Sequence, residues 1–412
     1  MTPATRFCFL TTFYPPYHFG GDAIGVQRFA RGLAKRGYHV TVIHDADAYA
    51  VLTGGAVPPP EAIDPFGVRV VTLRTALPIV STLLTQQVGR PVVNGPRLRR
   101  LIDEGQFDVI AFNNVSLIGG PGLFAYGNGA AKVYLAHEHW LVCPTHVLWR
   151  HGRELCNGRE CVRCQLRHHR PPQLWRFTHL LERQAEQIDT FVAMSEFSRG
   201  KHREFGFPRA MEVLPNFVSD PPATAVDAPR PHERPYFLYV GRLEAIKGVD
   251  DLIDAFAHEH GPDLLIAGSG TQEESLRARA NGNARVRFVG SVPASGLSAY
   301  YRHAIALLAP SLCFETFGLT LIEAFSYGTP VIARRLGPFP EIVEQSGGGE
   351  LFDTNAELRA AMQRLHAAPE LRRQMGAAGH AAYRRNWSED AVIPRFLDIV
   401  ERARAHRQRS VH

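Results

Sequence analysis

The chain has 412 residues, of which 45% are hydrophobic and 21% are charged, and its formal net charge is +6. This length predicts two or three domains with full cores, and no apolar run approaches the roughly 18 residues that a membrane-spanning helix needs. The positive charge favours an acidic partner, namely a nucleotide diphosphate, an anionic lipid surface or a lipid-diphosphate acceptor, and no recognised motif points to nucleic acid.

The first residues form a short apolar segment that ends at Pro15-Pro16. The segment lacks a small-residue cleavage site, so it is interpreted as a first strand and not as a signal peptide. A cytoplasmic protein is therefore expected, with peripheral contact at the inner face of an anionic membrane as an alternative.

Apolar strands alternate with helical spacing through the first half, which is expected to form one domain over residues 1–216. Strands are expected at 6–12, 39–43, 68–73, 107–112, 131–136 and 190–194, and a helix at 22–36. Such alternation is typical of an α/β domain with a mostly parallel sheet and helices on both faces.

The loop after the first strand contains Gly20 and Gly21 and opens the helix at 22–36. Backbone amides at such a helix start can approach an anion closely. The glycine spacing departs from the G-x-G-x-x-G pattern of dinucleotide-binding folds, so an ordinary turn is the alternative. The sequence Asp45-Ala46-Asp47 follows the second strand; it is interpreted as a loop, and no catalytic metal is expected.

His137 directly follows the strand at 131–136, which places it at the carboxyl edge of the predicted sheet. Ligands of open α/β sheets bind at that edge. A single histidine there is more often structural, and His139 lies close enough to compete for any functional role.

The six cysteines fall into two groups. Cys8 and Cys313 lie in strand-like apolar runs and are expected to be buried thiols. The other four lie in a Cys- and His-rich insertion at about 143–170, at Cys143, Cys156, Cys161 and Cys164. This spacing is compatible with reduced thiols, with a structural zinc site or with an iron–sulfur cluster, whereas a cytosolic protein is not expected to form disulfides.

Basic residues are scattered along the chain except between Arg163 and Arg183, where they gather around Trp175. The simpler interpretation of this stretch is a solvated loop and helix face. The alternative is a patch that touches a membrane or a membrane-bound acceptor, with Trp175 at the level of the lipid headgroups.

A proline-rich segment at 219–235 is the best candidate for a linker. The alternation of strands and helices resumes after it, so a second domain is expected over 217–387. A last helix is expected from Ser388 to Arg404, within a C-terminal segment of residues 388–412.

The second half begins with the strand 236–240, which Gly241 ends. Arg242 and Lys247 flank the short loop that follows, before a segment with helical spacing. An arginine offers phosphate oxygens a planar fork, and a lysine adds a compact charge. Their position after a strand's carboxyl end favours an anion-binding loop over an ordinary solvated one.

Two carboxylates stand eight residues apart at Glu315 and Glu323, after an expected strand at 304–311. If a helix begins just after Glu315, eight residues make about 2.2 turns, and both carboxylates can face one cleft. The amides of Phe317, Gly318 and Leu319 then point outward at the helix start, where anions bind. Amides for a phosphate and carboxylates for hydroxyl groups would suit a phosphorylated sugar.

Together these elements resemble family 4 of the retaining glycosyltransferases, which have the GT-B fold. The resemblance covers most of the chain and is specific in the second half, at the strand-GRL-x3-KG element of 236–248, LLIAGSG of 264–270, RFVGSV of 287–292 and the E-x7-E block of 315–323. It is looser in the first half, at 13–43, 133–140 and 191–217.

The resemblance implies two Rossmann-like domains facing across a central cleft, with the last helix packing back on the first domain. It implies that Arg242 and Lys247 neutralise the leaving diphosphate, assisted by the amides of 317–319. By the same resemblance, Glu315 binds sugar hydroxyl groups and Glu323 the ribose. The remaining implied donor contacts are the pair Gly20-Gly21 over the diphosphate, His137, preferred over His139, at the sugar, and the backbone around Val289 at the base.

The implied activity is transfer of a sugar, with retained configuration, from a nucleotide-diphosphate sugar to a sugar or lipid-linked acceptor. Polysaccharide or lipid-linked glycan synthesis is the expected pathway, and no cofactor is required. The alternatives are an epimerase or phosphorylase of the same fold and a binding protein without activity. A glycoside hydrolase is disfavoured because eight helical residues span about 12 Å, more than the roughly 5–9.5 Å between hydrolase carboxylates.

Overall fold

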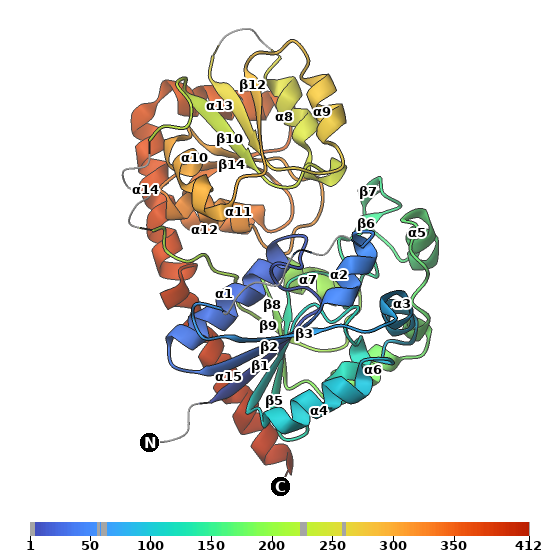
Figure 1. Ribbon diagram of the computed structural model, residues 1–412. Coiled ribbons are helices and arrows are strands. Elements are labelled where there is room, and N and C mark those ends of the chain that lie inside the picture. Colours follow the sequence, from blue (N-terminus) through green and yellow to red (C-terminus); the bar gives the residue numbers. More distant parts are fainter. Residues whose placement is uncertain (1–4, 56–57, 59–63, 223–228, 258–260, 412) are drawn as a thin grey trace. The chain divides into compact units, whose positions relative to one another are not determined.

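The computed structural model describes residues 5–55, 58, 64–222, 229–257 and 261–411. The chain forms two compact units, one of residues 1–215 and 392–412 and the other of residues 216–391 (Figure 1). The boundary therefore lies before the proline-rich segment expected to be the linker, of which residues 223–228 fall outside the described residues.

Each unit has a Rossmann-like core, which confirms the predicted α/β class. The first unit holds a seven-stranded sheet in the order β3-β2-β1-β4-β5-β8-β9, and every neighbouring pair is parallel. In chain order these strands are β1 (Arg6–Leu10), β2 (His39–Asp45), β3 (Arg69–Leu73), β4 (Val109–Phe112), β5 (Ala131–Ala136), β8 (Thr190–Ala193) and β9 (Met211–Val213).

The helices of the first unit lie on both faces of this sheet (Figure 1). They are α1 (Gly21–Lys35), α2 (Ala46–Leu52), α3 (Pro78–Val88), α4 (Gly95–Gly105), α5 (Cys161–Arg167), α6 (Leu180–Ala185), α7 (Glu196–Glu204) and α15 (Glu389–Val411), with 3₁₀ turns η1 (Pro121–Ala125) and η2 (Leu174–Phe177). A separate hairpin of β6 (Trp149–Arg150) and β7 (Glu154–Leu155) lies in the cysteine-rich insertion.

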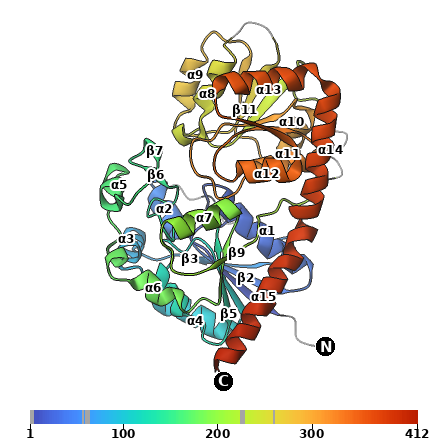
Figure 2. The same cartoon turned by 180° about the vertical axis from the view of Figure 1, so that it is seen from behind.

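Strand β1 shows how the core of the first unit is built. Successive side chains of a strand point to opposite faces, and Cys8 and Leu10 belong to the same core cluster as Leu98 and Ile102 of α4. The other face of the strand meets α15, where the ring of Phe396 lies 6.3 Å from that of Phe7 (Figure 2). Residues 392–412 thus form part of the first unit, although they follow the second in the chain.

The second unit holds a six-stranded parallel sheet in the order β12-β11-β10-β13-β14-β15. Its strands are β10 (Tyr236–Val240), β11 (Asp263–Ala267), β12 (Val286–Gly290), β13 (Leu307–Ala309), β14 (Val331–Arg334) and β15 (Gly349–Phe352). Its helices are α8 (Val249–Ala255), α9 (Glu273–Arg279), α10 (Leu297–His303), α11 (Leu319–Ser326), α12 (Phe339–Ser346), α13 (Asn355–Ala367) and α14 (Pro369–Asn386), with 3₁₀ turns η4 (Ala245–Lys247) and η5 (Ala294–Gly296).

The proline-rich segment expected to be a linker is instead tied into the second unit at its start. Val218 pairs with Ser388 in an isolated bridge, and the Tyr383 hydroxyl donates to the Val218 carbonyl at 3.1 Å. Asp220 accepts from the Arg384 guanidinium at 2.8 Å. These bonds hold residues 218–220 against the carboxyl end of α14.

Candidate functional site

The loop that carries Lys247 is held against the loop that follows β13. Gly248 ends η4 with φ +67°, and a Cβ atom there would lie 2.4 Å from the Pro310 carbonyl oxygen. Only glycine fits this close approach without strain. The Leu312 amide donates to the Ile246 carbonyl at 2.9 Å, which joins the two loops at the carboxyl edge of the sheet.

These joined loops bring Lys247 and Glu315 into contact. Lys247 Nζ lies 2.6 Å from Glu315 Oε1, and the same oxygen accepts from Ser311 Oγ at 2.7 Å. Burial by itself would raise the pKa of Glu315, but the Lys247 ammonium and these hydrogen bonds outweigh it and hold the pKa below its usual range. Burial opposes the charge on Lys247 as well, yet Glu315 keeps that pKa raised. Both groups are therefore charged at neutral pH.

Arg242 lies on the same loop and faces solvent. Its guanidinium donates from Nη1 to Glu244 Oε1 at 2.6 Å, and its side chain is 47% exposed. The Tyr239 hydroxyl donates to the Arg242 carbonyl at 2.9 Å and so fixes the backbone at this point. The positive charge of Arg242 also contributes to lowering the pKa of Glu315. Arg242 and Lys247 thus form one positive region, each with a carboxylate partner.

The start of α11 is shaped as expected, but the two glutamates have different partners. Gly318 caps the helix, and a Cβ on it would meet Ile342 at 3.0 Å, while the helix begins at Leu319. Three residues therefore separate Glu315 from the helix, so the two glutamates do not lie on one continuous helix and the expected 2.2-turn relation between them is wrong. Glu323 lies within α11 and accepts from the Tyr301 hydroxyl of α10 at 2.9 Å.

Two further residues of the second unit, Phe317 and Val289, were also predicted to contact the donor. Phe317 precedes the cap of α11 and is buried, so its side chain supports the loop while its backbone continues to the helix start. Val289 lies near the end of β12, at the edge of the sheet, and is half-buried.

The first unit carries the remaining predicted residues. Gly20 caps α1 in an extended conformation and Gly21 is its first residue. In the first turn, Asp22 accepts from the Asn114 side-chain amide at 3.2 Å. Because Asn114 follows β4, this bond ties the glycine loop to the carboxyl edge of the sheet.

His137 lies at that same edge, directly after β5. Its Nε2 lies 3.1 Å from Asn113 Oδ1, while the amide nitrogen of Asn113 donates to two carbonyls, those of Leu10 and Ala111. Since those bonds fix the amide orientation, Oδ1 must accept from His137, and the proton lies on Nε2. His139 is fully buried, and its ring lies 5.4 Å from that of His202, inside the unit.

Four contacting residues escaped the sequence analysis: Ser311, Tyr301, Asn113 and Glu138. Glu138 follows His137 and pairs with His146, and burial raises its pKa despite that partner. A polar Asn-Asn pair directly after the apolar strand 109–112 was a usable signal for Asn113. Nothing local distinguishes Tyr301 or Ser311, because their role depends on contacts with other elements.

The interpretation of Asp45-Ala46-Asp47 as a loop is wrong. Asp45 ends β2 and caps α2, where its side chain accepts from the Asp47 amide at 2.9 Å. Asp47 accepts from the amide and the hydroxyl of Thr75 at 2.8 and 2.7 Å. Both carboxylates are buried in these structural roles.

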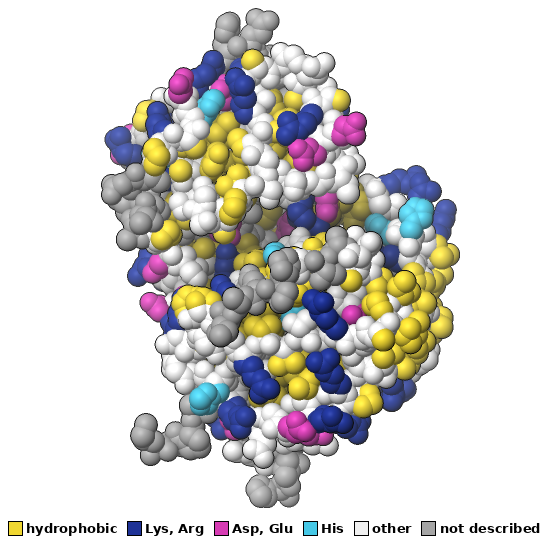
Figure 3. All heavy atoms as spheres, viewed as in Figure 1, with side chains coloured by type: hydrophobic (Ala, Val, Ile, Leu, Met, Phe, Trp, Pro, Cys, Tyr) yellow, Lys and Arg dark blue, Asp and Glu magenta, His cyan; other side chains and the backbone are white. Residues whose placement is uncertain are grey.

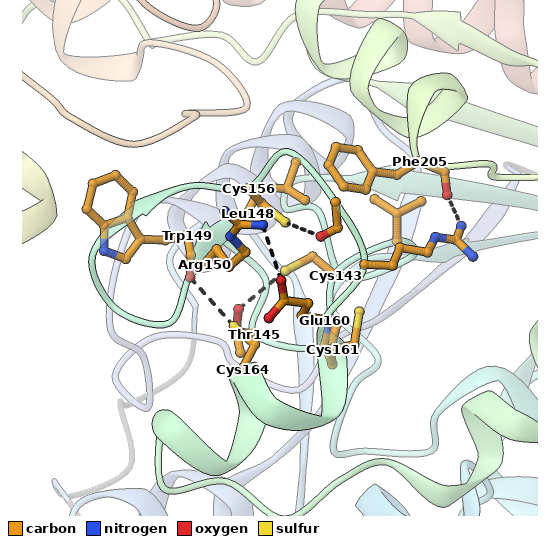
Figure 4. Close-up of a pocket in the computed structure, with 14 residues that line it drawn as sticks. Cys143, Thr145, Leu148, Trp149, Arg150, Cys156, Glu160, Cys161, Cys164 and Phe205 are labelled. Atoms are coloured by element: carbon orange, nitrogen blue, oxygen red, sulfur yellow. Dashed lines mark hydrogen bonds and ion pairs between the residues drawn. The ribbon is translucent and has the colours of Figure 1, made fainter.

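The four cysteines of the insertion surround one small cavity of about 20 Å³, shown in Figure 4. Cys143 shares a hydrogen bond with the Thr145 hydroxyl, Cys156 donates to the Gly158 carbonyl, and Cys164 accepts from the His151 amide. All six thiols of the chain are free. Within the described ranges, no three Cys, His, Asp or Glu side chains are arranged to hold a metal ion, so the zinc site stays a prediction.

Two family models account for most of the chain. The model described as Glycosyltransferase Family 4 matches residues 19–221, and the model described as Glycosyl transferases group 1 matches residues 223–382. The chain belongs to glycosyltransferase family 4. This enzyme is therefore a glycosyltransferase.

Curated relatives include glycosyltransferases that act on inositol compounds. A phosphatidyl-myo-inositol mannosyltransferase of Mycobacterium leprae is 29% identical over 406 residues, covering 94% of this chain and 95% of the relative. A D-inositol 3-phosphate glycosyltransferase of Segniliparus rotundus is 33% identical over 228 residues, covering 50% of this chain and 51% of the relative.

Solved structures share the whole fold at low identity. Sucrose-phosphate synthase from Thermosynechococcus elongatus has a TM-score of 0.72 at 20% identity, covering 98% of this chain and all of that one. Anabaena HepE in complex with UDP has a TM-score of 0.67 at 16% identity, covering 96% and 99%. The GT-B fold of the glycosyltransferase is thereby established. None of its described helices is long and apolar enough to cross a membrane.

Proposed function

We propose that this glycosyltransferase moves a hexose, with retained anomeric configuration, from a nucleotide-diphosphate sugar to a hydroxyl group of a lipid-linked or polysaccharide acceptor. The contact between Lys247 and Glu315 carries the proposal, because it places an ammonium and a carboxylate together at the carboxyl edge of the second sheet. The relatives that act on phosphatidylinositol and inositol phosphate support a polyol acceptor. The structurally similar protein HepE was solved with UDP and with UDP-glucose, which supports a UDP-sugar as the donor.

Lys247 and Arg242 stabilise the charge that grows on the diphosphate as it leaves. Such stabilisation is worth most where the donors are preorganised and partly shielded from water. Lys247 meets both conditions, since its side chain is only 18% exposed and Gly248 fixes its loop. Arg242 is more exposed and exchanges Glu244 for a phosphate when the donor binds.

Glu315 has two tasks, one for each of its oxygens. Its Oε1 accepts from Lys247 and Ser311, and so it orients the ammonium. Its Oε2 is the atom available to a sugar hydroxyl group. The lowered pKa keeps the carboxylate ionised, so Glu315 is unsuited to act as the general acid that a hydrolase needs.

Glu323 binds the ribose hydroxyl groups of the nucleotide, with Tyr301 as its supporting donor. The Tyr301 ring stacks on Tyr327 at 5.5 Å between centroids, so the hydroxyl is held in place. The backbone around Val289, at the end of β12, contacts the base. The amides of residues 317–319 assist the phosphates, because a helix start leaves amides without intrahelical partners.

In the first unit, His137 is the residue proposed to contact the donor sugar, and Gly20 and Gly21 are those proposed to contact the diphosphate. Asn113 holds the His137 ring with its proton on Nε2, which orients the imidazole for contact with the sugar. Gly20 and Gly21 supply backbone amides to the diphosphate at the start of α1. No metal or other cofactor takes part in this mechanism.

A panel of nucleotide sugars tests the proposal. The matching donor should raise the melting temperature, and adding an inositol-containing acceptor should then release nucleoside diphosphate. NMR coupling at the anomeric carbon of the product should show the configuration of the donor. An inverted product would overturn the mechanism.

Incubation with the donor alone separates the rival activities. Rapid epimer formation would identify an isomerase, and release of free sugar without acceptor would identify a hydrolase. Binding of a donor with no turnover on any acceptor would identify a carbohydrate-binding protein. Each of these outcomes contradicts the transferase assignment.

A further inference from the structure

Helix α3 has its polar side chains inside and its apolar side chains outside. Ser81, Thr82 and Thr85 are the buried residues of the helix, whereas Ile79 is 67% exposed and Leu83 is 47% exposed. A surface helix of a water-soluble protein normally shows the opposite pattern. The outer face of α3 is therefore suited to a medium less polar than water.

A second segment continues this surface. Gln86 and Gln87 of α3 donate to the carbonyls of Pro171 and Pro172, at 2.8 and 2.9 Å, so η2 lies directly beside α3. Leu174 and Phe177 of η2 are 58% and 65% exposed. Twelve of the sixteen large apolar side chains that are exposed among the described residues belong to 77–93 or 162–177. These twelve side chains are called the apolar face, and Figure 3 shows a large hydrophobic area on the side of the first unit where α3 lies.

The surroundings of the apolar face are basic. Residues 65–102 and 161–181 contain ten arginines and no aspartate or glutamate, although the whole chain has 40 acidic residues. Arg90 lies just beyond α3, and Arg163 and Arg167 lie on α5; all three are exposed, although Arg163 lies 3.8 Å from Glu160, the acidic residue just before α5. Arg176 differs from these exposed arginines. Its guanidinium packs over the Trp175 ring at 4.4 Å, and burial lowers its pKa to about 10.

We propose that the apolar face docks this glycosyltransferase onto an anionic phospholipid bilayer, with α3 lying in the headgroup region. Exposed aliphatic side chains enter the boundary between headgroups and acyl chains, and arginines around them bind lipid phosphates. A second copy of the chain is a less suitable partner for the apolar face. A symmetric dimer contact would place the arginines of the two copies opposite each other, and their charges would repel. Trp175, the residue expected at the headgroups, is only 3% exposed and lies in the core, so Phe177 takes its place.

The position of α3 links this surface to the acceptor. The helix begins five residues after Leu73, the last residue of β3 and so a point on the carboxyl edge of the first sheet. Arg74 and Thr75 in the connection contact Tyr17 and Asp47. A lipid-linked acceptor would thus reach the edge that carries His137 from the adjoining membrane. The membrane contact itself does not depend on the proposed function, because it can be measured without donor or acceptor.

Vesicle flotation of the full-length protein tests the docking. Vesicles of phosphatidylglycerol and phosphatidylcholine should bind the protein, and vesicles of phosphatidylcholine alone should bind it weakly. The double variant Ile79→Ser/Leu83→Ser should lower the partition coefficient about tenfold or more. Each substitution removes the favourable free energy of transferring an aliphatic side chain from water into the membrane. The variant Arg163→Gln/Arg167→Gln should lower binding to the anionic vesicles by about tenfold and leave binding to phosphatidylcholine unchanged.

The control is Phe66→Ser, which removes an apolar side chain that is 42% exposed and lies near Arg31 and Lys35 of α1. It should bind vesicles like the wild type. Failure of the wild type to bind anionic vesicles, or equal loss in the control, would overturn the proposal. So would a dimer, seen by light scattering without lipid, that the Ile79→Ser/Leu83→Ser variant dissociates, because the face would then be a contact between copies.

Discussion

Lys247 Nζ and Glu315 Oε1 lie 2.6 Å apart, although 68 residues separate them in the chain. One residue follows β10 and the other follows β13, which are neighbours in the sheet. The pair is charged at neutral pH because each partner opposes the effect of burial on the other.

The variant Lys247→Met should lower kcat by roughly 100-fold or more, because loss of one preorganised electrostatic donor costs about 2.7–4 kcal/mol. Glu315→Gln should lower it similarly, since it frees Lys247 from its orienting partner. The double variant should be hardly worse than either one, because the two side chains act as a unit. The matched control is Lys201→Met, which breaks the ion pair with Glu204 at 2.8 Å and should leave turnover unchanged. Full additivity of the two losses would contradict the coupling.

Arg242→Ala should lower kcat by roughly 100-fold if its guanidinium reaches the leaving diphosphate. Glu244→Ala should leave kcat nearly intact and tighten donor binding, because it removes the carboxylate that competes for Arg242. Arg279→Ala serves as the control, since this arginine is similarly exposed and paired, with Asp254. A near-normal rate for Arg242→Ala would remove it from the mechanism.

Glu323→Gln should weaken binding of the free nucleoside diphosphate with a smaller effect on kcat, because the ribose lies away from the reacting bond. Tyr301→Phe should give a milder loss of the same kind, since it removes only the hydrogen bond that positions Glu323. Isothermal titration calorimetry measures both. Unchanged affinity in Glu323→Gln, with the exposed Glu344→Gln as reference, would show that the ribose role is wrong.

Asp45 makes folding stability depend on pH. Burial and the neighbouring Asp47 raise its pKa from 3.8 to about 7. The folded state therefore binds this proton more tightly than the unfolded state, and the stability it contributes below pH 4 is lost as pH rises through about 7.

Asp45→Asn should remove this loss and keep an acceptor for the Asp47 amide. At pH 8 the variant should be more stable than the wild type by about 4 kcal/mol, and at pH 3.5, where Asp45 is largely protonated in both states, the two should differ little. Urea unfolding at both values measures the difference, with the exposed Asp103→Asn as control. Equal stability at pH 8 would mean that Asp45 is ionised in the fold without cost.

The four clustered cysteines should be reduced thiols in the purified protein. Burial raises the pKa of Cys156, Cys161 and Cys164, so without a bound metal these thiols stay protonated at neutral pH. Metal analysis after purification without chelator should find less than about half an equivalent of zinc or iron. A full equivalent, lost together with stability in Cys161→Ser, would instead support the structural zinc site.

Much of the fold followed from local signals. The strands around 6–10, 39–45 and 131–136 are apolar runs long enough to be buried, and parallel sheets need such runs. Residues beyond strand ends, among them Arg242, Lys247 and His137, were predicted as site residues because the carboxyl edge of an α/β sheet binds ligands. Predictions were wrong where a short polar sequence was compatible with two local structures. Asp45 could begin a loop or cap a helix, and burial of α2 decided for the cap.

The sequence by itself determined the alternation of strands and helices and the family to which the glycosyltransferase belongs. Those features depend on residues that are close together in the chain, and the spacing of such residues is visible in the sequence itself. Only the tertiary structure decided which carboxylate faces Lys247, that Tyr301 supports Glu323, and that α3 turns its aliphatic side chains outward. Each of these depends on a partner far away in the sequence, and a one-dimensional pattern does not record which side chains share a surface.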